Sequence, residues 1–310
     1  MLTNTIIKNS NCIEHVLCNI LQNMGLDYSM LFTDSWSIFV DKDTPLPLRD
    51  RLDIYHPGYY ELFENLKGYY GVDKEVYAWP DSYKKLQAMV DTHEYLCLRI
   101  QTAACPWLIA IEGMEEYHYL LVTSIDSSGL YGYDYSSTSM KKLSLENLEK
   151  GAMELLSFHK IQDEVNAQEY ERDVKRKLRE KAETHKLSKN ICLLAEELDD
   201  GASVLSELSY CDLIISPLLR KISYIGFGRQ NFLTSFQRGA FTDKFDLEEE
   251  IERLLEISKR WLFLNKLFTK YALSKNEEIL QKIKGYLQSL SVEEETLLDR
   301  FLMKMGKERV

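Results

Sequence analysis

The sequence predicts an α+β fold, in which an N-terminal helix packs against an antiparallel sheet and an α-helical region follows. Short apolar runs typical of strands lie close together before residue 160. Strands that follow one another without helices between them pair as antiparallel neighbours. Beyond residue 160 the chain is rich in Leu, Glu and Lys at helical spacing. We therefore expect two domains, residues 1–160 and residues 161–310.

The composition excludes several classes of protein. The 310 residues include 38 basic and 49 acidic side chains, a formal net charge of −11, whereas a nucleic-acid partner needs a basic surface. No apolar run reaches the roughly 18 residues of a membrane-spanning helix, and we expect neither a membrane partner nor a signal peptide. The six cysteines form no C-x-x-C pair, which predicts reduced thiols in the cytoplasm and no metal site.

The first predicted element is a helix that starts at Cys12. Asn11 or Ser10 precedes it as an N-cap residue, and Gly25 follows it as a natural stop. Apolar residues recur along this helix at helical spacing: Ile13, Val16, Leu17, Ile20, Leu21 and Met24. The segment from Ser35 to Tyr60 holds three prolines and many aromatic residues, so we expect it to be irregular. Its aromatic side chains either line a substrate pocket or fill the core.

Five segments are predicted to be strands, and a turn at Asp126–Gly129 joins the third to the fourth as a hairpin. They are Tyr95–Gln101, Trp107–Glu112, His118–Thr123, Gly129–Asp134 and Leu155–His159.

In the second half, three capping boxes predict helix starts at Asp246, Ser274 and Ser291, each with a Glu three residues later. The segment from Arg172 to Lys189 contains eight basic and three acidic residues. This segment is either a solvated helix face or a docking site for an acidic carrier domain, which a basic patch attracts at long range.

Cys12 is the strongest candidate for a catalytic residue. A helix N-terminus offers free N–H groups and a partial positive charge, which favour a thiolate and stabilise an oxyanion. The alternative is that Cys12 is a small buried residue like many free cysteines.

His118 opens a predicted strand, and Asp134 ends the next one. If Thr123 pairs with Gly129 across a five-residue loop, His118 lies directly opposite Asp134, where a carboxylate can orient an imidazole. The alternative is an ordinary surface pair. With Cys12, the two residues would supply a nucleophile, a base and an orienting group.

An Asn11-Cys12 pair opening an apolar helix, His118 opening a strand, and Asp134 sixteen residues later resemble the papain-like cysteine fold. Within it, residues 9–160 are most similar to the family of the butirosin-biosynthesis protein H N-terminal domain. Double-glycine leader peptidases are more distant relatives. The helical half resembles the C-terminal extension of such proteins more weakly.

The resemblance implies an acyl transfer or a thioester hydrolysis in natural-product biosynthesis of the nonribosomal-peptide or polyketide type. Cys12 would be the nucleophile, His118 the general base and acid, and Asp134 the orienting group. The donor would be an acyl or peptidyl group on the phosphopantetheine of a carrier protein, and the acceptor a small-molecule or peptide amine, or water. The enzyme would need no other cofactor.

Two positions depart from the papain-like pattern. Ile6 stands where peptidases place a Gln that completes the oxyanion hole, and Ile13 stands where leader peptidases have Gly. The second oxyanion donor is therefore open, with Asn9 and Asn11 as candidates. His15, one helical turn after Cys12, is a further candidate that would tune the thiol. The alternative is an ordinary surface residue or one that supports a neighbouring site residue.

Two other functions remain open. The first is a cysteine peptidase or amidase, which would cleave an unactivated peptide. The second is a non-catalytic binding module that retains the fold, in which Cys12 would show ordinary thiol reactivity.

Overall fold

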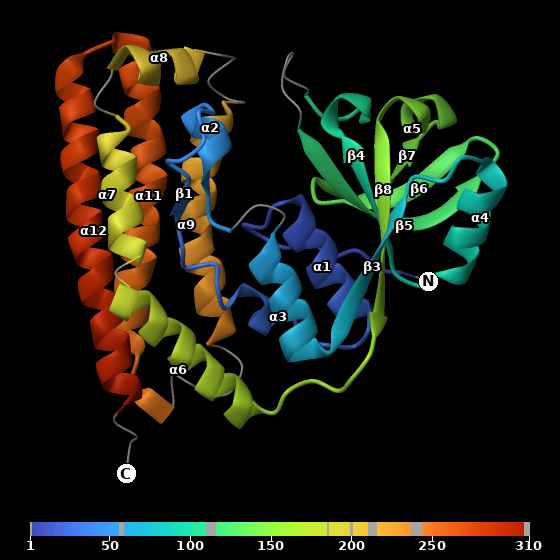
Figure 1. The fold of residues 1–310 in the computed structure, drawn as a ribbon, viewed down its shortest axis with the longest axis horizontal. Coiled ribbons are helices and arrows are strands. Elements are labelled where there is room, and N and C mark those ends of the chain that lie inside the picture. Colours follow the sequence, from blue (N-terminus) through green and yellow to red (C-terminus); the bar gives the residue numbers. More distant parts are fainter. Residues whose placement is uncertain are drawn as a thin grey trace. The chain divides into compact units, whose positions relative to one another are not determined.

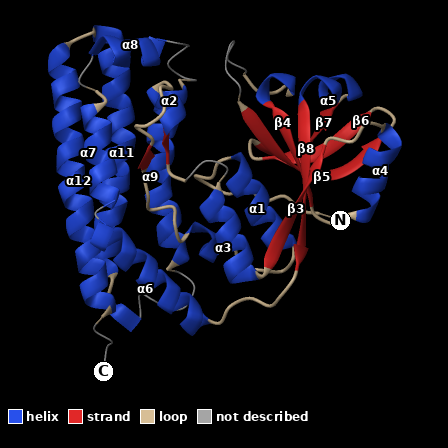
Figure 2. Ribbon diagram, viewed as in Figure 1, coloured by secondary structure: helices blue, strands red, loops and turns tan. Residues whose placement is uncertain are grey.

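A computed structural model describes residues 2–55, 59–109, 116–184, 186–198, 201–209, 216–236 and 244–306. The chain forms two compact units. The first combines residues 1–28 with residues 63–164, and the second combines residues 29–62 with residues 165–310. Helices and strands coexist, and the sheet is antiparallel, so the α+β class is confirmed (Figure 2).

The first unit is built on a six-stranded antiparallel sheet of the described residues, with the strand order β3-β8-β4-β5-β6-β7 (Figure 1). Its strands are β3 (Val72–Ala78), β4 (Leu96–Gln101), β5 (Tyr117–Asp126), β6 (Gly129–Asp134), β7 (Ser137–Leu143) and β8 (Ala152–Lys160). The prediction for β6 is confirmed in both bounds. The expected strand at Trp107–Glu112 is wrong where it is described, since Trp107 lies in a turn after the short helix η2 (Thr102–Ala104), and residues 110–112 lie outside the described residues.

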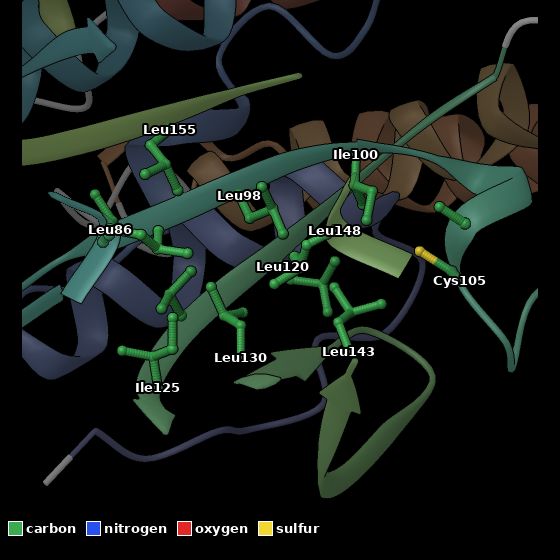
Figure 3. Packing of buried hydrophobic residues seen from close by; sticks show 13 residues of the cluster. Leu86, Leu98, Ile100, Cys105, Leu120, Ile125, Leu130, Leu143, Leu148 and Leu155 are labelled. Carbon is green, nitrogen blue, oxygen red and sulfur yellow. The ribbon is translucent and has the colours of Figure 1, made fainter. Parts of the chain in front are cut away.

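Helices pack on this sheet through apolar faces. Helix α1 (Cys12–Asn23) packs against β5 and β6, and buries nine consecutive residues from Ile13 to Leu21. Helices α4 (Tyr83–Thr92) and α5 (Leu145–Gly151) cover a second cluster of buried side chains. Figure 3 shows this cluster, in which Leu86 of α4 and Leu148 of α5 meet Leu98 and Leu120 of the sheet. Helix α3 (Tyr60–Tyr70) leads into β3.

The second unit is helical. It contains η1 (Ser29–Phe32), α2 (Leu48–Arg51), α6 (Ala167–Thr184), α7 (Lys186–Glu196), α8 (Gly201–Ser209), α9 (Pro217–Ser235), α11 (Glu248–Ser274) and α12 (Glu277–Met305), with one small sheet of β1 (Phe39–Val40) and β2 (Leu52–Asp53). The last three helices pack against one another in the order α9, α11, α12. Among the described helices, none is long and apolar enough to cross a membrane.

The observed units differ from the expected domains in residues 29–62, and the second boundary follows residue 164 and not residue 160. Residues 29–62 belong to the helical unit, although they precede most of the sheet in the sequence. The physical reason is the side chain of Trp36, which is fully buried beside Phe232 and Phe301 and donates its indole N–H to Glu294 at 2.7 Å. A local reading of composition cannot detect an anchor that joins residues so far apart.

The predicted capping boxes of the second half are wrong. Leu247 is the N-cap residue of α11, and Asn276 caps α12 through its side chain, while Ser274 ends α11. Ser291 and Glu294 lie in the interior of α12 and are buried there. A spacing of three residues suits one face of a helix as well as a cap, so the pattern was ambiguous.

Glu294 forms the buried ionic centre of the helical unit. Its carboxylate accepts two hydrogen bonds from Arg229 Nη2, at 2.7 and 3.0 Å, and the indole N–H groups of Trp36 and Trp261 at 2.7 and 2.5 Å. Both charged side chains are fully buried. Both carboxylate oxygens therefore have donors, which offset the desolvation of the buried pair.

We expect Glu294→Ala to lower the free energy of unfolding by about 3–5 kcal/mol, the range for removing one partner of a buried ion pair. Arg229 would then be buried without a counter-charge. Urea unfolding of the full chain measures the loss, and Glu293→Ala is the matched control. Glu293 pairs with Arg260 and Arg253 nearer the surface, so its loss should be about 0–1 kcal/mol. Equal losses in the two variants would contradict the central role of Glu294.

Candidate active site

Cys12 is the first residue of α1 and is partly exposed. Asn11 caps the helix in a capping box: its side-chain oxygen accepts the Glu14 N–H at 3.0 Å, and the Glu14 carboxylate accepts the Asn11 N–H at 2.8 Å. The backbone oxygen of Asn11 takes the N–H of His15. The N–H groups of Cys12 and Ile13 belong to the free first turn, where a helix presents donors to an anion.

The hairpin that carries His118 and Asp134 differs from the expected one. Asp126 pairs with Gly129 in a tight turn, so the predicted register, with Thr123 opposite Gly129, is wrong. If this register continued along both strands, His118 would lie opposite Ser137, and the Asp134 side chain would point to the face of the sheet away from His118. A bulge between Val122 and Ser124 shifts the pairing by one residue and returns Asp134 to the face of His118, one diagonal step away.

The two side chains meet on that face. His118 Nε2 lies 2.7 Å from Asp134 Oδ2, and both side chains are buried. Asp134 has two further donors: the Trp107 indole N–H reaches Oδ2 at 2.7 Å, and the Ser136 backbone N–H reaches Oδ1 at 2.6 Å. The Asp134 carboxylate, which three donors hold, orients the imidazole through Nε2. Nδ1 is the ring nitrogen that does not contact Asp134.

Cys12 interacts with this pair through a hydrogen bond and through its charge. Burial alone would lower the pKa of His118, but the hydrogen bonds to Asp134 and Cys12, together with their charges, raise it to about 9. Burial opposes ionisation of Asp134, yet the hydrogen bond and charge of His118 hold its pKa well below the usual range. The structure thus brings Cys12, His118 and Asp134 together, and keeps a proton on the imidazole at neutral pH.

Asn11 and Asn9, the two candidate oxyanion donors, lie in different environments. The side-chain oxygen of Asn11 is engaged in the helix cap, so this residue shapes the end of α1. Asn9 is exposed and adopts a left-handed backbone with φ of 62°. Ile6, at the position of the missing Gln, is also exposed.

His15 is fully buried, so the surface alternative for it is wrong. Its Nε2 donates to Asn4 Oδ1 at 2.9 Å, and Asn4 Nδ2 donates to the Ser137 carbonyl at 3.0 Å. One turn further along α1, Asn19 exchanges hydrogen bonds with the backbone N–H and carbonyl of Thr5. The N-terminal segment is therefore bound along α1, and it links the helix of Cys12 to the start of β7, just after Asp134.

His15 Nδ1 is buried and has no hydrogen-bond partner among the described atoms. Burial lowers the pKa of His15 to about 4, with Asp134 raising it and His118 lowering it further. The imidazole is therefore neutral at pH 7, and it lies within electrostatic reach of the two site residues.

Sequence reasoning missed Trp107 and Asn4 as parts of this site. Trp107 was expected in a strand, and no local pattern marks an indole that reaches a distant carboxylate. Asn4 precedes every predicted element, so only its contacts with His15 and Ser137 define its place.

No protein-family model matches the chain, and no curated protein sequence matches it. An assignment of chemistry therefore rests on the residues of the site and their geometry.

The neutral state of His15 predicts a pH-dependent stability. Between about pH 6.5 and 4, His15 binds a proton in the unfolded chain but stays neutral in the folded chain. The free energy of unfolding therefore falls as the pH falls through this window. His15→Gln retains an N–H donor for Asn4 and has no titrating group. We expect wild type to lose more unfolding free energy than His15→Gln between pH 7 and pH 4.5 in urea titrations. Parallel losses would show that His15 does not titrate in this way.

The raised pKa of His118 gives a second test. NMR titration of the imidazole nitrogens should show His118 protonated until about pH 9 in the wild type. Cys12→Ala removes two of the causes that raise this pKa, and Asp134→Asn removes two others, so each variant should titrate at a lower pH. His159, which lies on β8, serves as an internal reference. A His118 midpoint that is unchanged in Cys12→Ala would mean that the two side chains do not interact.

Proposed function

We propose that the chain is a papain-like cysteine acyltransferase or thioesterase, with the closest resemblance to the family of the butirosin-biosynthesis protein H N-terminal domain. The supporting observation is the series Cys12, His118 and Asp134, in which a buried carboxylate orients an imidazole that interacts with a thiol at a helix N-terminus. Nucleophile, base and orienting group are the minimal set for covalent acyl transfer.

The first half of the reaction forms an acyl-enzyme. The Cys12 thiolate attacks the carbonyl carbon of a carrier-bound thioester, and the free N–H groups at the start of α1 stabilise the oxyanion. The bond from this carbon to the pantetheine sulfur breaks. The leaving sulfur takes a proton from the His118 imidazolium, so the imidazole becomes neutral.

The second half releases the acyl group. An amine or water attacks the acyl-enzyme and gives a proton to neutral His118. The bond from the acyl carbon to Cys12 breaks, and the thiolate and imidazolium are restored. Asp134 stays ionised throughout, because its donors and the low pKa favour the carboxylate.

A thioester donor suits this site better than a peptide donor. A peptide is the less reactive acyl donor, and it depends more on oxyanion stabilisation and on protonation of a poor leaving group. Here Ile6 occupies the position at which peptidases place a side-chain donor, so the helix N–H groups remain the principal donors. The natural-product pathway and the carrier partner follow from the resemblance and are part of the proposal.

The decisive experiment is intact-protein mass spectrometry after brief incubation with acyl-pantetheine thioesters. We expect one acyl adduct on the wild type and none on Cys12→Ala. Cys192→Ser, which removes an exposed cysteine of the helical unit, is the matched control and should keep the adduct. His118→Ala should slow adduct formation by about 10²–10⁴-fold, the usual contribution of a general acid–base group.

The outcomes separate the competing functions. Adduct formation that persists in Cys12→Ala would contradict the assignment of the nucleophile. No adduct with any acyl chain, although iodoacetamide alkylates Cys12, would favour the non-catalytic binding module. Cleavage of an unactivated peptide without reaction at thioesters would favour the peptidase.

A further inference from the structure

The helical unit contains a cavity that the proposed reaction does not use. Its volume is about 280 Å³, and it lies between α6, the start of α7 and the segment before β1. Four apolar side chains line it: Ile38, Phe39, Ile54 and Leu187. Within the aromatic segment from Ser35 to Tyr60, Trp36 fills the core and Phe39 lines this cavity, while a substrate pocket stays a prediction.

A buried amine gives this cavity its polar end. The Lys181 side chain is 15% exposed and reaches the cavity from α6. Its Nζ donates one hydrogen bond, to the Trp36 carbonyl at 3.1 Å, and lies 3.8 Å from the Asp34 carboxylate. An ammonium has three protons to donate, so Lys181 has donor capacity left for a ligand.

Lys181 shares the Asp34 carboxylate with another lysine. Lys177 holds Asp34 at 2.6 Å, whereas Lys181 lies 3.8 Å from it, and Lys177 also lies 3.7 Å from Asp173. Burial lowers the pKa of Lys181 to about 8; the charge of Asp34 raises it, and those of Lys177 and Arg229 lower it.

Three other charged side chains line the cavity. Glu180 on α6 accepts a hydrogen bond from Arg176, and the charge of Glu61 on α3 raises the pKa of Lys181. Lys186 stands at the start of α7 and adds a positive charge. Three basic and three acidic side chains therefore line the cavity, and the donor capacity open to a ligand is that of Lys181.

We propose that this cavity binds a small carboxylate with a short hydrocarbon chain. The carboxylate would accept hydrogen bonds from Lys181 Nζ, and the chain would pack on Ile38, Phe39, Ile54 and Leu187. The cavity is smaller than the about 300–1,000 Å³ of pockets for drug-sized ligands, so its size suits a fatty acid no longer than octanoate. One incompletely paired amine suits a monoanion, whereas a phosphate needs more donors than this lining offers. The site is independent of the Cys12 chemistry.

Octanoate is the probe, and its binding to the full chain is measured by isothermal titration calorimetry and saturation-transfer NMR. At pH 7 we expect octanoate to bind the wild type, and Lys181→Met to weaken binding by at least about tenfold, since a charge-assisted hydrogen bond contributes on this order. Lys189→Met is the matched control, because Lys189 is an exposed lysine of α7, and its affinity should equal that of wild type. Octylamine should not compete.

A second measurement uses the wild type alone, so it tests the proposal even if Lys181→Met fails to fold. Affinity of the wild type for octanoate should fall as the pH rises above about 8, where Lys181 loses its proton. No octanoate binding, equal binding by Lys181→Met, or equal binding of octylamine would each overturn the proposal. A pH-independent affinity would overturn it as well.

Discussion

A carboxylate that is removed from water keeps its charge only when donors and a cation replace the water, and the first unit is arranged around this requirement at Asp134. Its oxygens are met by the imidazole of His118, the indole of Trp107 and the backbone N–H of Ser136. These contacts fix His118 through Nε2, and in the proposed reaction its other ring nitrogen would act on Cys12. The proposed acyl chemistry depends on this single buried hydrogen bond.

The helix that carries Cys12 is held by contacts of the same kind. Asn11 and Glu14 define where α1 begins, and therefore where its free N–H groups point. Buried His15 continues this arrangement through Asn4 to the start of β7. Together these side chains connect the helix of Cys12 to the strand that follows Asp134.

Two buried charges of the helical unit, Glu294 and Lys181, also need partners in place of water, and they differ in how fully they are paired. At Glu294 the charges and donors are complete, so the group stabilises the packing of α9, α11 and α12 around it. At Lys181 the donors are not all used: its amine donates one hydrogen bond, to the Trp36 carbonyl, and borders a cavity. A fully paired buried charge is structural, whereas one with spare donors has capacity for a ligand.

The sequence by itself determined the features that depend on neighbours within three or four residues. The helix from Cys12 with its Asn11 cap and the strand from Gly129 to Asp134 follow from capping and alternation, which act locally. Only the tertiary structure decided the rest. The tight turn and the bulge near Thr123 decide which face Asp134 occupies, and a one-residue shift reverses every side chain. The burial of Glu294 depends on partners far away in the chain, so no local pattern contains it.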